Sequence, residues 1–192
     1  VLTSYLYASA PAPEYRIAGE DRPFRFVGSA NYELPFGKGK AVGSDAGPWL
    51  NRLIGGWQMA GILNLQSGAP VGWGNVIYFG GDLNWDARNL NQTFDTSRFE
   101  RSAARVLNRN ARAFPSAFSG YRADKIYNID LSVIKSIPIV ERVRLQFRAE
   151  TFNLFNHAIF NGPNTDPVNA NFGRITSQSN LPRTTQLALR LT

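Results

Sequence analysis

The feature that most constrains this chain is an apolar residue at every second position, repeated in several runs of roughly ten residues. Successive side chains of a β-strand point to opposite faces, so each run predicts a strand with one apolar and one polar face. The clearest run is 24–34, where Phe24, Phe26 and Tyr32 alternate with polar residues such as Arg25 and Asn31. Similar runs cover residues 1–9, 57–67, 127–133, 142–154 and 184–192. The sequence therefore predicts an all-β fold, an antiparallel meander of about six long strands.

The length and charge of these runs favour strands that cross a bilayer. A tilted transmembrane strand needs about 9–11 residues, whereas strands of soluble domains have about 5–6. The polar faces carry Arg144, Arg148 and Glu150, which a dry core would accommodate poorly and a water-filled lumen well. The alternative is a soluble sheet whose polar face meets bulk water.

The connections between the runs alternate in length. Residues 136–141 predict a tight turn, and residues 35–40 begin another connection. The segments at about 68–125 and 155–183 show no sustained period and predict long outer loops, with the short run 172–177 inside the second loop. The chain 1–192 is thus interpreted as a single β-barrel segment. Because a closed barrel needs about eight strands, six must belong to a larger outer-membrane-type barrel or to an open sheet completed by partner strands.

Composition narrows the function classes. The chain has no cysteine and one histidine, so thiol nucleophiles, zinc clusters and multi-histidine metal sites lack their ligands. We therefore expect no enzyme, no metal and no cofactor. The net charge of +7 raises the alternative of a soluble nucleic-acid-binding sheet, but much of the arginine falls on polar strand faces and in loops, so we expect no nucleic-acid partner. No helical run is long enough to span a membrane.

The strongest basic cluster lies in the first long loop, between residues 98 and 112. If this stretch were helical, its arginines would gather on one stripe, able to contact phosphate, lipopolysaccharide or another anionic ligand. The alternative, which the sequence favours, is a solvated loop helix. The candidate anion-contacting residues are Arg98, Arg101, Arg105, Arg109 and Arg112.

Other motifs in the chain are weak. The stretch from Asp82 begins like a calcium loop but lacks its glycine and its terminal glutamate. Trp73 and Trp85 suggest packing or interface aromatics more than sugar stacking. The turn around Lys38 lacks the spacing of a phosphate loop, and His157 has no catalytic partner at a recognisable spacing.

Several strings, in this order and spacing, resemble the C-terminal barrel of TonB-dependent outer-membrane receptors. They cover most of the chain from Arg16 onward, and the similar group is the Oar-like type with a carboxypeptidase-regulatory-like domain. The strings are EDRPFRFV (20–27), YELPFGKGK (32–40), GGWQ (55–58), LQSGAP (65–70), FDT (94–96), NIDLS (128–132), LQFRAETFNLFNH (145–157) and FGRITS (172–177).

This resemblance implies a plugged barrel of about 22 strands that takes up a nutrient across the outer membrane of a Gram-negative bacterium. The implied partners are the rest of the barrel, the plug domain and outer-membrane lipid, with TonB contacted only through missing N-terminal parts. On its own the chain is not expected to perform energised transport. It also departs from the family pattern, because it ends in Leu191-Thr192 rather than in an aromatic residue.

A structural role is the main alternative. Six strands leave two open edges, at residues 1–9 and 184–192, and exposed edges recruit partners by strand addition. Copies of the chain could then assemble into a ring, tube or filament, in an extracellular location.

Overall fold

The computed structural model describes residues 5–106, 111–112, 114–140 and 143–192. The chain divides into two compact units, which we describe separately. The sheet unit comprises Arg25–Leu65, Tyr127–Ala158 and Leu181–Thr192. The loop unit comprises Val1–Phe24, Gln66–Ile126 and Ile159–Asn180.

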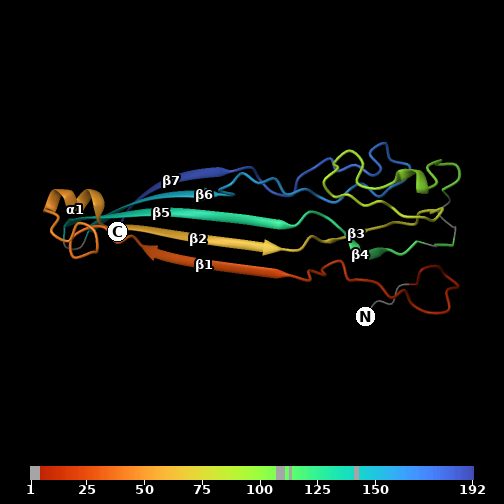
Figure 1. Ribbon diagram of the computed structural model, residues 1–192, viewed down its shortest axis with the longest axis horizontal. Coiled ribbons are helices and arrows are strands. Elements are labelled where there is room, and N and C mark those ends of the chain that lie inside the picture. The colour runs from red at the N-terminus through yellow and green to blue at the C-terminus, as the bar shows by residue number, and fades with distance from the viewer. Residues whose placement is uncertain (1–4, 107–110, 113, 141–142) are drawn as a thin grey trace. The chain divides into compact units, whose positions relative to one another are not determined.

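The sheet unit is built on one open antiparallel sheet in the order β1-β2-β5-β6-β7, whose strands lie side by side in Figure 1. Its strands are β1 (Arg25–Glu33), β2 (Trp57–Gln66), β5 (Ile126–Val140), β6 (Val143–Phe152) and β7 (Thr184–Leu191). Lys135 of β5 lies opposite Phe147 of β6, which in turn lies opposite Leu189 of β7. The mostly β, antiparallel fold expected from the alternating runs is confirmed.

The expected strand at residues 1–9 is wrong over its described part. Residues 5–9 form bends and a turn, with one isolated bridge between Tyr5 and Pro13, and residues 1–4 lie outside the described part of the chain. Pro11 and Pro13 lie on the segment that faces Tyr5 and have no backbone N–H to donate, which disfavours a regular ladder between this segment and residues 5–9. Over the described residues the sheet therefore has five strands, with β1 at one edge.

The tight turn expected at 136–141 is also wrong over its first five residues. Strand β5 continues to Val140, with Ile137 opposite Leu145 and Pro138 opposite Arg144. The register shifts between Pro138 and Val140, where proline removes a ladder donor. The β-branched residues of this stretch favour the extended backbone, so the strand is 15 residues long.

The connection from β1 to β2 contains a short helix, α1 (Pro48–Ile54), which lies at one end of the sheet in Figure 1. Pro48 occupies the first turn, where its missing N–H costs nothing. The preceding turn packs closely on the helix: Gly37 has a φ of +115°, and a Cβ there would lie 2.7 Å from Asn51 Oδ1. Only glycine fits this position.

The loop unit is organised around aromatic side chains. Strand β3 (Pro70–Gly72) pairs with β4 (Ala117–Arg122), and a 3₁₀ turn, η1, covers Thr96–Arg98. The segment 68–125, expected to be a loop, thus contains a small hairpin, whereas 172–177 is not a strand of the sheet, as expected. The unit's buried cluster consists of Val71, Trp73, Val76, Leu83, Phe94, Phe99, Phe114 and Phe172.

Asn153 ends β6 in the sheet unit. Its φ of +51° is left-handed, a conformation that asparagine tolerates better than most residues. Its side-chain amide donates to the carbonyls of His157 and Leu181, and its Oδ1 accepts from the His157 N–H. The same residue's backbone N–H donates to Asp130 Oδ1 at 2.9 Å. Asn153 therefore ties the end of β6 to the start of β7 and to β5.

We expect Asn153→Ala to lower the free energy of unfolding by about 2 kcal/mol, because it removes the buried side chain that pairs the backbone groups of His157 and Leu181. Urea titration of the protein in lipid vesicles measures this loss. Asn31→Ala, at an exposed position of β1, is the matched control and should leave the midpoint unchanged. Equal effects of the two substitutions would show that Asn153 does not hold this junction.

Candidate functional site

The sheet presents one continuous apolar face. Rows of side chains run across three strands, such as Val133, Ala149 and Leu187. Another row on the same side comprises Ile137, Leu145 and Leu191, and the leucines of β7 are exposed. Because the strands pair in this register, the apolar positions of neighbouring strands fall on the same side.

Strands β1 and β2 extend this face. The Leu34 N–H donates to the Trp57 carbonyl, and the Ser67 N–H donates to the Phe24 carbonyl. These two bonds fix an antiparallel register in which the apolar alternation of both strands is in phase. Phe26 and Tyr32 are about half exposed on β1. The result is a broad apolar surface, much of which is exposed on the edge strands β1 and β7.

The opposite face is polar and hydrogen-bonded across strands. Glu150 accepts from Ser132 Oγ at 3.3 Å, from Arg148 at 3.3 Å and from Gln186 Nε2 at 2.5 Å. These four residues come from β5, β6 and β7. Charged groups so arranged require contact with water, and they can offer hydrogen bonds to a polar solute.

The same polar character continues at the β1 edge. Glu33 accepts from Lys40 Nζ at 3.0 Å and from Gln58 at 3.2 Å. One sheet thus carries an apolar surface and a wall of paired charges, the division that an outer-membrane barrel needs between lipid and lumen.

Lys135 is the exception, since its position in the alternation places it on the apolar face. The side chain is buried, and its ammonium donates to the carbonyls of Leu53 at 3.0 Å and of Gly55. It also lies 5.1 Å from the centre of the Trp57 ring. Both carbonyls belong to the end of α1, where the helix dipole is negative, so the charge is compensated locally. Sequence reasoning missed this contact, because no local pattern reveals it.

The expected helix over the arginine cluster is wrong in its described part. Asp95 caps η1 by accepting from the Ser97 N–H, and the backbone is extended at Phe99. Residues 103–105 form a single turn, in which the Arg105 N–H donates to the Ser102 carbonyl. Phe99 is buried in the aromatic cluster, and its burial favours the extended chain over a helix that would expose it. The hydrogen bonds from Ser97 and the charge of Arg98 hold the pKa of Asp95 below its usual value.

Arg101 and Arg112 contact residues of the loop unit that are distant in the sequence. Arg101 donates to the Pro167 carbonyl and lies 5.6 Å over the Phe172 ring. Arg112 donates to the carbonyls of Phe114 and Trp73.

The other arginines form ion pairs or cannot be placed. Arg98 contacts Asp95 at 3.1 Å, and Arg105 contacts Glu100 at 3.7 Å. Arg109 lies outside the described residues. Each described arginine of the cluster therefore has an intramolecular partner, and no single stripe forms.

The remaining motifs have structural roles in this fold. Asp82 Oδ1 accepts from the Asn84 N–H in a local turn, and over the described residues no group of three or more metal-binding side chains forms. Trp73 is buried, and Trp85 stacks on Phe94, which confirms packing rather than stacking on a sugar.

His157 and the turn around Lys38 each make contacts within the sheet unit. The ring of His157 lies edge-on to Tyr127. The Lys38 N–H donates to Asn51 Oδ1 and so closes the turn before α1. Among the described helices, none is long and apolar enough to span a membrane.

Glu14 is a buried acid that sequence reasoning did not identify. Its carboxylate accepts from the backbone N–H and the hydroxyl of Ser116, and its side chain is only 6% exposed. Burial by itself raises the pKa of Glu14, but the two Ser116 hydrogen bonds and the charges of Arg112 and Arg16 outweigh it and leave the pKa lowered. The ionised carboxylate thus fastens the N-terminal segment of the loop unit to its hairpin.

The lowered pKa of Glu14 predicts a loss of stability in acid. A group with a depressed pKa in the folded state contributes stability above its ordinary pKa, about 4.3 for glutamate, and loses it as the pH falls through the folded value. We expect protection of the Ser116 amide to decrease as the pH is lowered through that range. Hydrogen exchange, corrected for the intrinsic rate, measures this protection. Glu14→Gln should lower protection at neutral pH and abolish its acid dependence, and an unchanged pH profile in this variant would contradict the assignment.

Comparison with known protein families matches residues 3–186 to the family described as Outer membrane beta barrel domain. No curated protein and no solved structure matches the chain. The family match covers nearly the whole chain and agrees with the antiparallel sheet, its apolar face and its polar face. The chain belongs to the outer membrane β-barrel domain family and is a protein of the bacterial outer membrane.

Proposed function

We propose that this chain forms part of the barrel wall of a TonB-dependent outer-membrane receptor that takes up a nutrient such as an oligosaccharide or a peptide. The observation that carries the proposal is the hydrogen-bonded network around Glu150 on strands whose other face is apolar and exposed. The strings from residues 20–27 to 172–177, which resemble such receptors, support the receptor type over other barrels.

In this role the two faces of the sheet contact different surroundings. The apolar face meets lipid, and the polar face lines a water-filled lumen along which a polar solute passes. The long loops at about 68–125 and 155–183 belong to the outer side in this proposal, and a plug domain and the remaining strands complete the receptor. Energised transport needs those parts and TonB, so this chain contributes the wall and the solute contacts, with no catalytic step and no cofactor.

The arginines of the loop unit are proposed contacts for an anionic ligand such as phosphate or lipopolysaccharide. Arg105 is the best placed of those described, because its side chain is 77% exposed. A guanidinium can bind phosphate with two parallel hydrogen bonds, and the ion pair with Glu100 is weak enough at this exposure to exchange for such a ligand.

The strand edges favour a second candidate, a structural assembly. In the described sheet β1 and β7 each pair on one side only, and every residue of β7 is exposed. Unpaired edges add strands from other chains, so copies of this protein could build a ring, tube or filament.

The mass of the native particle with and without detergent separates the two candidates. The receptor proposal predicts a particle that needs detergent for solubility and contains the N-terminal plug. A detergent-free polymer of 21.3 kDa units would instead contradict the transporter and support assembly through the edges. A soluble monomer whose binding to DNA weakened steeply with salt would overturn both.

A further inference from the structure

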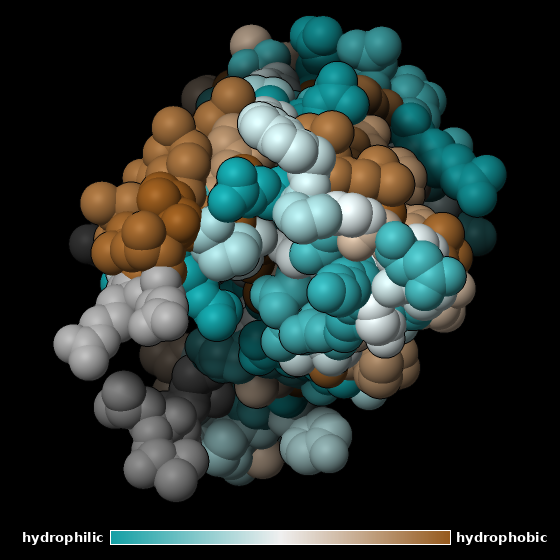
Figure 2. Space-filling model, turned by 90° about the vertical axis from the view of Figure 1, so that its left-hand side faces the viewer, coloured by the Kyte–Doolittle hydropathy of each residue, from teal (hydrophilic) through white to brown (hydrophobic). Residues whose placement is uncertain are grey.

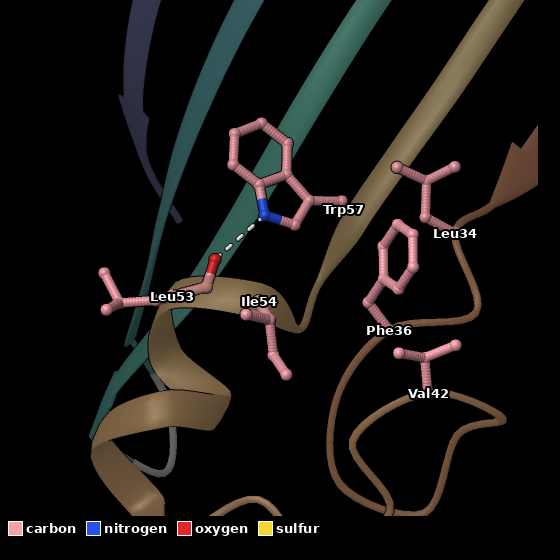
Figure 3. A pocket seen from close by; sticks show the side chains of 6 residues that line it. All are labelled: Leu34, Phe36, Val42, Leu53, Ile54 and Trp57. Carbon is pink, nitrogen blue, oxygen red and sulfur yellow. Dashed lines mark hydrogen bonds between the residues drawn. The ribbon is translucent and has the colours of Figure 1, made fainter.

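The connection between β1 and β2 forms an apolar hollow in the sheet unit. Figure 3 shows six side chains around it, from β2, from α1 and from the turn before the helix. Its volume is about 400 Å³, and its lining is Leu34, Phe36, Val42, Leu53, Ile54 and Trp57. The Trp57 indole N–H donates to the Leu53 carbonyl at 2.9 Å, so the polar atom of this wall is already satisfied. The hollow therefore offers hydrocarbon contacts and little else.

Helix α1 places a second apolar surface beside this hollow. Trp49, Leu50 and Leu53 are 80%, 50% and 69% exposed. At 100° per residue these three lie within one stripe of the helix, whereas Asn51 points away from it and accepts from the Lys38 N–H. A stripe of large apolar side chains facing away from the protein's own packing is unusual for a helix in water.

The fold fixes the exposure of the apolar stripe on α1, because the helix is held by contacts on two sides and is not frayed. The Lys135 ammonium and the Trp57 indole both donate to the last turn of α1, and the Gly55 N–H donates to the Asn51 carbonyl. The glycine turn at Gly37 fits closely against Asn51 on the other side. These contacts hold the helix in place with its stripe uncovered.

Charge around the helix complements an anionic surface. Residues 35–56 contain the cations Lys38, Lys40 and Arg52 and a single acid, Asp45. The Arg52 guanidinium lies 5.9 Å from the centre of the exposed Trp49 ring. Tryptophan with neighbouring basic residues is enriched where a bilayer's hydrocarbon meets its headgroups.

The stripe also continues the apolar face of the sheet. Leu34 and Trp57 both line the hollow and lie at the end of the apolar alternation on β1 and β2. Figure 2 looks onto the end of the molecule that carries α1 and shows a hydrophobic patch at its left, next to a mostly hydrophilic surface.

We propose that α1 and the apolar hollow beside it form an interfacial anchor. They dock into the phospholipid leaflet at the end of the strands where β1 connects to β2. Trp49, Leu50 and Leu53 enter the boundary between headgroups and acyl chains, and Arg52 and Lys38 face anionic headgroups. The anchor rests on the proposed function in one respect, that the apolar face of the sheet meets lipid. It does not depend on the receptor's substrate or on TonB.

Single-cysteine labelling tests this anchor, since the chain has no cysteine of its own. An environment-sensitive fluorophore is placed at Leu50→Cys on α1 in the full chain, folded into vesicles of phosphatidylglycerol and phosphatidylethanolamine. Leu187→Cys and Ala188→Cys are matched controls on the apolar and polar faces of β7. A quencher attached to the lipid and aqueous iodide then report what surrounds each label, and circular dichroism checks that each variant folds as the parent does.

The anchor predicts that the label at residue 50 behaves like the one at 187: blue-shifted, quenched by lipid and protected from iodide. Quenching of the residue 50 label by iodide, with lipid quenching kept at 187, would overturn the anchor and leave the lipid-facing sheet intact. Protection of the residue 50 label from both quenchers would mean that protein covers α1, and would also overturn it. Loss of lipid quenching at both 50 and 187 would contradict the proposed function as well.

A second readout avoids the cysteine substitution. The emission of Trp49, obtained by subtracting the spectrum of Trp49→Phe from that of the parent, should be quenched by brominated phospholipid. In vesicles of phosphatidylglycerol, Arg52→Glu should weaken the quenching of Trp49, whereas in vesicles of phosphatidylcholine it should have less effect. A Trp49 emission that changed neither with brominated lipid nor with the headgroup charge would overturn the anchor independently of the labels.

Discussion

The constraint on which the sheet depends is that backbone pairing and side-chain alternation stay in phase across all five strands. In a bilayer every backbone N–H and C=O must be paired, and a slip of one residue would move each apolar side chain to the polar face. The row from Lys135 through Phe147 to Leu189 and the row from Ser132 through Glu150 to Gln186 show both faces held in one register. Asn153 maintains this register where β6 ends.

Outside the sheet, aromatic burial organises the chain. Trp73 stacks on Phe99 with ring centres 5.5 Å apart, and Phe172 from a distant segment lies 5.3 Å from the same ring. This packing converts two long aperiodic segments into one unit. It also explains why the arginines are dispersed, since each follows the path that the buried rings impose on the backbone, as Arg101 does over Phe172.

The strands and their two faces were predictable because a period of two is a local property of the chain. Residues 5–9 were mispredicted because alternation says nothing about whether a pairing partner exists. The helix expected over the arginines failed for a related reason: a favourable charge stripe is worth little against the burial of Phe99. Glu14 and Lys135 could not be found at all, because their partners lie 102 and about 80 residues away along the chain.

The sequence by itself determined the strand faces, the membrane-type strand length and the membership in an outer-membrane barrel class, since all three follow from local alternation and from matching strings. Tertiary structure alone decided that the long loops share an aromatic core and that Lys135 caps the helix between β1 and β2. It also decided that Trp49, Leu50 and Leu53 stay exposed on that helix. The physical reason is that burial depends on which distant segments come into contact, and the alternation of neighbouring residues does not predict those contacts.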